Sequence, residues 1–192
     1  MLFRSTAIDI PETVNNIGND AFKNCKNLTA IEIPTAVSTL GGTFNGCSSL
    51  AYVSLSAGMV YNSNAFTGTA LTTIKLVKAP KHAAISRSAT SATSAFTATT
   101  SKHTPWYIAS TTHKVNIIIG EGITSIVNYT FNGCLAENLT FFIEGATAPT
   151  AGTYNVPYTN ATQYVGLNTT WEYDSLGMPV VKTAAPEEEV VA

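Results

Sequence analysis

Charged side chains are scarce in this chain of 192 residues: Asp, Glu, Lys and Arg make up 11% of it, and the formal net charge is -2. Soluble globular domains usually contain about 25% charged residues. Nucleic acid is normally bound by a clearly basic domain, so the composition argues against that partner. Long apolar runs are also missing, since "VNIII" and "LTFFI" fall far short of the roughly 18 residues of a membrane span. We expect neither nucleic-acid binding nor membrane insertion.

A secretory signal is also missing from the beginning of the sequence. The stretch "MLFRSTAIDIP" has one Arg and few apolar residues before a strand-like segment begins, whereas a signal peptide needs a longer apolar centre. We expect either that a signal has been removed or that the protein never carried one.

Motifs for catalysis and for metal binding are missing as well. The three histidines, His82, His103 and His113, do not have the i, i+4 spacing of a zinc helix, and no cysteine pair has zinc-site spacing. There is no G-x-S-x-G elbow and no phosphate-binding glycine loop. We expect no enzymatic activity, no metal and no cofactor.

The chain does contain an internal repeat. The phrase "IDIP" at residues 8–11 returns 23 residues later as "IEIP" at 31–34, and a looser unit ends at Leu76. Another copy begins with "VNIII". Each unit opens with an alternating apolar stretch, which predicts a short strand, followed by a proline that ends the strand. The remainder of each unit is too short for a full helix and predicts a wide turn.

Stacking such units buries a continuous apolar column, because one unit cannot cover its own apolar face. The repeat therefore predicts a mainly β solenoid with irregular or short helical turns, in which the strands stack as a parallel ladder. Cys25 and Cys47 could approach closely enough for a disulfide, but stacked side chains point side by side, so we expect buried thiols. The predicted core residues share two slots of the repeat and are Phe22, Phe44, Phe66, Phe131, Cys25, Cys47 and Cys134.

The period breaks once, in an Ala/Ser/Thr-rich stretch. We expect an enlarged, irregular turn docked on the stack there, with a flexible linker as the alternative. The predicted organisation is solenoid turns over 1–76, the enlarged turn over 77–114, a further turn over 115–143, a C-terminal cap over 144–182 and an acidic mobile tail over 183–192.

The pattern I-x-I-P-x-x-V-x-x-I-G-x-x-A-F-x-x-C-x-x-L resembles the BspA-like class of leucine-rich repeats, found in many surface proteins of mucosal and gut bacteria. The resemblance covers residues 8–76 and 117–143. A closing element of the same class is similar to the segment that contains Tyr154, Val156, Pro157, Tyr164 and Trp171. The resemblance implies a leucine-rich-repeat solenoid used for adhesion or protein binding, with no family catalytic site.

We therefore expect an extracellular or cell-surface module that binds a protein or a glycan through the exposed ladder face. The alternative is a structural subunit of a surface appendage or virion, in which another chain or a second copy docks on the open N-terminal end. The candidate partner-binding residues are a stripe of outward strand residues, Asp9, Glu32, Ser54, Lys75 and Asn116, and three aromatic residues, Trp106, Tyr107 and Tyr158.

Overall fold

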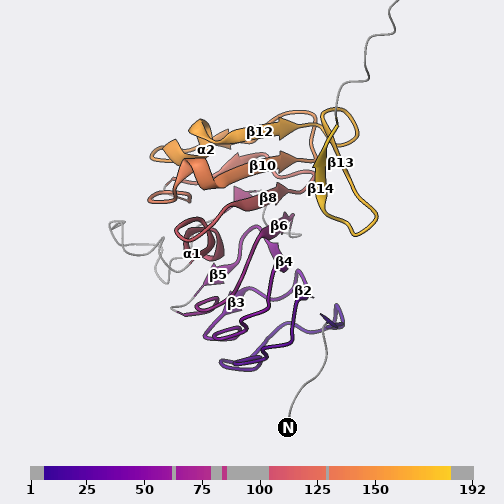
Figure 1. The fold of residues 1–192 in the computed structure, drawn as a ribbon, viewed down its shortest axis with the longest axis vertical. Coiled ribbons are helices and arrows are strands. Elements are labelled where there is room, and N and C mark those ends of the chain that lie inside the picture. The colour runs from indigo at the N-terminus through magenta and orange to yellow at the C-terminus, as the bar shows by residue number, and fades with distance from the viewer. Residues whose placement is uncertain (1–6, 62–63, 79–83, 86–103, 129, 183–192) are drawn as a thin grey trace, which may run out of the picture.

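The fold is a solenoid with one parallel sheet along its length (Figure 1). The computed structural model describes residues 7–61, 64–78, 84–85, 104–128 and 130–182. Seven strands pair in the order β1-β2-β4-β6-β8-β10-β12, and every neighbouring pair is parallel. Their bounds are β1 Ala7–Ile8, β2 Ala30–Glu32, β4 Tyr52–Ser56, β6 Thr73–Val77, β8 Val115–Ile119, β10 Leu139–Ile143 and β12 Thr162–Val165. The predicted parallel ladder is confirmed.

The register of the ladder stacks equivalent repeat positions on one another. Ile8 pairs with Ile31, as the "IDIP" and "IEIP" echo predicts, and Ile31 pairs with Val53. The same inward row continues through Ile74, Ile117 and Phe141 and ends at Gln163. Alternate residues of each strand point to opposite faces, so this row faces the core and the intervening residues face outward.

Short strands on the far side of the coil form two smaller ladders. β3 (Thr39–Leu40) pairs with β5 (Val60–Tyr61). β7 (Ala84–Ile85), β9 (Ser125–Ile126) and β11 (Thr150–Ala151) form a second ladder. Each of β2, β4, β6, β8 and β10 is thus followed by a two-residue strand of a smaller ladder.

The wide turns also stack by backbone hydrogen bonds. The Phe22 N–H donates to the Thr43 carbonyl and the Phe44 N–H to the Ala65 carbonyl, both at 3.0 Å. The residue before the Cys slot has a left-handed backbone, with φ of 59° at Asn24 and 75° at Gly46. Gly and Asn adopt this conformation at the lowest cost, which explains the "N-C" and "G-C" pairs of the repeat.

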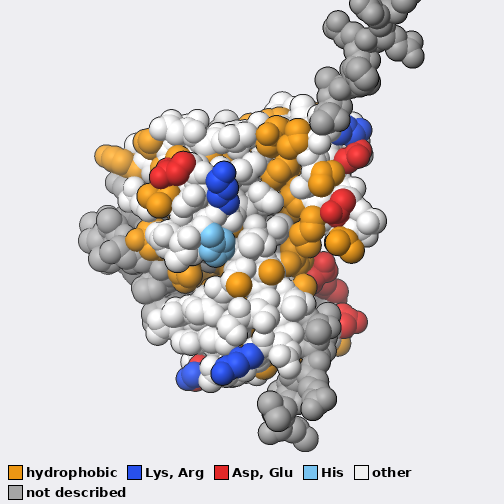
Figure 2. Space-filling view, in the orientation of Figure 1, with side chains coloured by type: hydrophobic (Ala, Val, Ile, Leu, Met, Phe, Trp, Pro, Cys, Tyr) orange, Lys and Arg blue, Asp and Glu red, His pale blue; other side chains and the backbone are white. Residues whose placement is uncertain are grey.

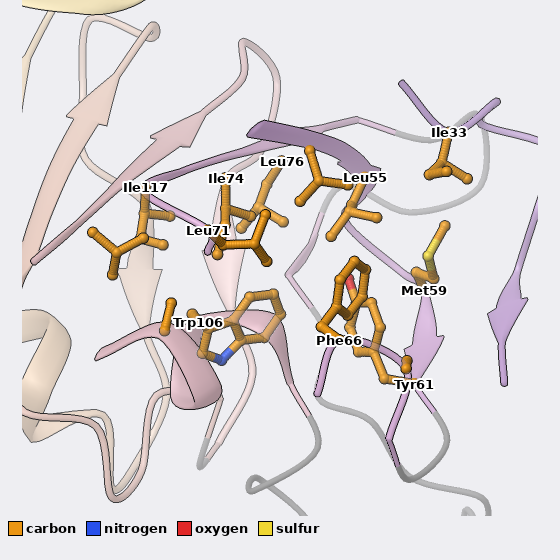
Figure 3. Packing of buried hydrophobic residues seen from close by; sticks show 14 of the residues in the cluster. Ile33, Leu55, Met59, Tyr61, Phe66, Leu71, Ile74, Leu76, Trp106 and Ile117 are labelled. Atoms are coloured by element: carbon orange, nitrogen blue, oxygen red, sulfur yellow. The ribbon is translucent and has the colours of Figure 1, made fainter. Parts of the chain in front are cut away.

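Aromatic rings form a row through the core. Phe22 and Phe44 stack with ring centroids 5.4 Å apart, and Phe44 and Phe66 stack at the same separation. The row then passes through Tyr61 and Trp106 before it reaches Phe131; Figure 3 shows Phe66, Tyr61 and Trp106 beneath the strand residues. Phe44, Phe66 and Phe131 are fully buried, whereas Phe22 is half-buried because it lies at the β1 end.

The enlarged turn joins two strands that are direct neighbours, since β6 pairs with β8. Within it, α1 (Pro105–Ser110) begins after Thr104, whose hydroxyl accepts a hydrogen bond from the Tyr107 N–H. Of the described parts, β7 pairs with β9, and α1 contacts the stack through the hydrogen bond from the Trp106 indole N–H to the Thr130 carbonyl. Docking of the whole turn stays a prediction. Ala95 and Phe96, which carry a further copy of the repeat's A-F pair, lie outside the described residues.

The C-terminal part closes the solenoid and then folds back over it. After η2 (Ala136–Asn138) and α2 (Val156–Asn160), the strands β13 (Trp171–Tyr173) and β14 (Pro179–Val181) form an antiparallel hairpin. Trp171 is fully buried against Ile118 and Phe142, on the outward face of the sheet. The predicted acidic tail over 183–192 lies outside the described residues.

Candidate functional site

The outer face of the seven-stranded sheet is the surface on which the sequence places a binding stripe. The register runs Glu32, Ser54, Lys75 and then Ile118 along one row. Asn116 pairs with Thr73 and therefore belongs to the neighbouring row. The expectation that Asn116 continues the row of Lys75 is wrong, because the residue of β8 that pairs with Lys75 is Ile118, two positions after Asn116.

The hairpin β13–β14 covers part of this face. Ser54 is only 7% exposed, so it is not an accessible contact residue, contrary to expectation. Lys75 is half-buried and bonded within the chain. Asp9 and Glu32, towards the β1 end, are exposed. The accessible part of the predicted stripe is thus its acidic end.

Lys75 lies between a carboxylate and an aromatic ring. Its Nζ is 3.1 Å from Glu144 Oε1 and 5.0 Å from the ring centroid of Tyr173, whose hydroxyl donates to Glu144. The Glu121 N–H donates to the other Glu144 oxygen at 2.9 Å. Burial acts to raise the Glu144 pKa, but the hydrogen bonds from Tyr173, Glu121 and Lys75 together hold this pKa below its usual value. This cluster fixes the hairpin to the sheet.

Beyond that cluster, a groove lies between the outer face and the tip of the hairpin. It has a volume of about 350 Å³. One wall is formed by strand residues, the other by residues 176–178 of the tip. The strand residues that line this groove are Ile8, Ala30, Ile31, Glu32 and Tyr52.

The groove is apolar with one acidic group. Glu32 is the single charged residue among its described lining, and Tyr52 beside it is half-buried. Burial, together with the negative charge of Glu32, raises the pKa of Tyr52 to about 12. The phenol is therefore neutral near pH 7, and a tyrosine ring can contact both apolar groups and cations.

The tip of the hairpin holds a leucine in solvent. Leu176 is 80% exposed. The carboxylate of Asp174 accepts hydrogen bonds from the Leu176 and Met178 N–H groups at 2.9 and 2.8 Å, and the Gly177 N–H donates to the Asp174 carbonyl. The exposed leucine is thus presented by an ordered turn.

Figure 2 shows how side chains are distributed over the surface. Most of the visible face is white, with few charged groups, whereas hydrophobic side chains gather on the side where Figure 1 places β13 and β14. Carboxylate side chains stand next to them. On the face in view, apolar side chains with carboxylates beside them thus lie along the hairpin side.

Two of the three predicted partner-binding aromatics lie in the core. Trp106 is fully buried, and its indole N–H donates to the Thr130 carbonyl at 2.8 Å. Tyr158 is 3% exposed and stacks on Phe131. The expectation of partner contact is wrong for both, because each fills a position in the aromatic row. Tyr107 is half-buried, and its predicted contact stays a prediction.

The cysteines are free thiols in the described chain. Burial raises the pKa of Cys47 to about 11 and that of Cys134 to about 12, so both are protonated near pH 7 and poor nucleophiles. Cys47 donates to the Phe22 carbonyl, and Thr69, in the same slot, donates to the Phe66 carbonyl. Cys25 is half-buried at the β1 end.

Within the residues that the structure describes, no three His, Cys, Asp or Glu side chains are grouped so that they could hold a metal ion. No helix of that part has the length and apolar character to span a bilayer.

The sequence did not indicate Tyr52, Leu176 or Met178 as site residues. Tyr52 occupies an outward strand position next to Ser54, so its alternation with Val53 was an available signal. The two hairpin residues have no repeat position, and only the folded hairpin brings them to the strands of the first coils.

Comparison with known proteins gives one family. A family model described as BspA type leucine rich repeat region matches residues 3–104 and 106–151 in six copies, which is more than half of the chain. No curated protein and no solved structure gives a significant match.

Proposed function

Because the chain belongs to the BspA type leucine-rich repeat family, a family of binding scaffolds, we propose that it is a non-enzymatic binding module that works outside the cell. Its target is a protein or a glycan, and its contact surface is the accessible β1 end of the outer face. The observation that carries this proposal is the exposed acidic pair, Asp9 and Glu32, beside the apolar groove. A rigid solenoid surface orders little on binding, which favours this use.

The test uses arrayed secreted proteins and arrayed glycans as probes. We expect the wild-type chain to bind a subset of them, and Asp9→Lys and Glu32→Lys to reduce that binding at least tenfold. The control is Glu137→Lys, an exposed carboxylate on η2, which should leave binding unchanged. Binding that all three variants retain would place the contact surface elsewhere.

A second candidate is a subunit of a surface appendage or virion, favoured by the β1 end of the core. Ile8, Ile10, Val14, Phe22 and Cys25 are only partly buried there, and another chain could cover them. Light scattering coupled to size-exclusion chromatography separates the two functions: a defined oligomer supports the subunit, and a lasting monomer supports the binding module.

A further inference from the structure

The groove beneath the hairpin tip carries an inference about the partner. We propose that it binds a short segment of a partner protein in which a Lys or Arg lies next to an apolar side chain. The inference rests on the proposed binding function and names the partner chemistry of the same surface.

The negative charge of the groove favours a basic residue in the partner. The described lining of the groove contains Glu32 and no Lys, Arg or His. Asp9, which follows Ile8 in the chain and is exposed, adds a second carboxylate to this end of the face. A cation approaching this surface is attracted, whereas an acidic segment is repelled.

The chain already shows how this face holds an ammonium group. Lys75 lies against the Glu144 carboxylate and over the Tyr173 ring. In the groove, Glu32 and Tyr52 supply the same two groups, a carboxylate and a neighbouring tyrosine ring, without a basic side chain among the described lining residues. A partner's Lys or Arg provides the missing cation.

The apolar contact comes from the hairpin tip and the strand residues. Leu176, held at 80% exposure by the Asp174 turn, and Met178 line the groove together with Ala30 and Tyr52, which lie in an outward row of the sheet. The volume, about 350 Å³, is at the small end of the range for ligand sites. It suits one or two side chains of a short segment and not a folded domain.

The experiment selects binders from a displayed library of random heptapeptides with the full chain as bait. We expect enrichment of peptides in which Lys or Arg lies within two positions of Leu, Ile, Met or Phe. The affinity of a selected synthetic peptide should fall at least tenfold in Glu32→Gln and in Leu176→Ser. Added salt should weaken its binding to the wild type more than its binding to Glu32→Gln.

Two control variants have the same chemistry away from the groove. Glu137 is an exposed carboxylate and Leu135 a leucine with 42% exposure, both near η2. Glu137→Gln and Leu135→Ser should leave the peptide affinity unchanged. Circular dichroism of all four variants checks that each is folded.

Other outcomes overturn the inference. Selected peptides that are acidic or uncharged, or that bind the groove variants as tightly as the wild type, show that the groove is not this site while the binding function stands. Glycan binding that depends on Glu32, with no peptide recovered, makes a glycan the occupant. Dimerisation lost in Glu32→Gln and Leu176→Ser makes a second copy the occupant. Absence of both peptide and array binding contradicts the binding function as well.

Discussion

At the scale of single residues, Gly120 shows where the ladder leaves no room for a side chain. Its N–H donates to the Leu76 carbonyl at 2.8 Å. A Cβ added to Gly120 would lie 2.8 Å from that same oxygen and 3.4 Å from the Val77 Cα. Both are backbone atoms of the paired strand, so they cannot rotate away as a side chain would.

Gly120→Ala should therefore lower the free energy of unfolding by about 1 to 3 kcal/mol, the usual cost of inserting a group into a packed site. Gly18→Ala is the matched control, because a Cβ there meets nothing within 4 Å. It should be neutral or stabilise by about 0.4 to 1 kcal/mol through the unfolded chain. Urea unfolding midpoints measure both, and equal losses would contradict the account.

At the scale of elements, the C-terminal hairpin is held by one buried aromatic residue and one charged cluster. Trp171 belongs to the segment that resembles the closing element of the repeat class, but it packs on the outer face of the sheet and not over the open end of the stack. The cluster of Lys75, Glu144 and Tyr173 could not be predicted from the sequence, because it joins residues from three distant parts of the chain. Only the register of β6 and β10 and the path of the hairpin bring them together.

Acid should weaken this attachment. The Glu144 pKa is lowered in the folded protein, so its stabilisation is present above the unfolded Glu pKa, about 4.3, and is lost as the pH falls through the folded pKa. Glu144→Gln should cost about 1.5 to 3 kcal/mol at pH 7, because it removes charged hydrogen bonds. It should also show a smaller loss of stability between neutral and acidic pH than the wild type.

Urea unfolding of the wild type and of Glu144→Gln at pH 7 and at about pH 3 measures this difference. Glu137→Gln, at an exposed carboxylate, is the control and should keep the wild-type pH dependence. A Glu144→Gln variant with the full wild-type dependence would exclude this cluster as its source.

At the scale of the whole molecule, the sequence predicted the stacked coils but not the contacts that the enlarged turn and the C-terminal hairpin make with them. Matching apolar positions revealed the equivalence of Ile8 and Ile31 and the row of phenylalanines, because stacking demands the same residue type at each level. The prediction that placed Trp106 on the surface is wrong. This residue lies in a short helix of the enlarged turn, where no repeat pattern shows which side chains face the core. The groove was missed because its two walls come from opposite ends of the chain.

Stability should vary along the solenoid. In repeat architectures each unit is stabilised by its neighbours, so an end coil opens at lower cost than an inner one. The Phe22 and Phe44 amides form equivalent hydrogen bonds of 3.0 Å, but Phe22 is half-buried and Phe44 fully buried. Hydrogen exchange should be at least tenfold faster at Phe22. Equal protection would mean that the β1 end is covered in solution.

The direct pairing of β6 with β8 has one more consequence. Thr73 and its partner Asn116 are 43 positions apart, whereas Tyr52 and its partner Thr73 are 21 apart, yet the strands meet as closely as any others. Because the entropy of closing a loop grows only slowly with its length, the longer connection should cost the ladder only about 0.6 kcal/mol more than the shorter one. A repeat scaffold can therefore join adjacent rungs by connections of very different length.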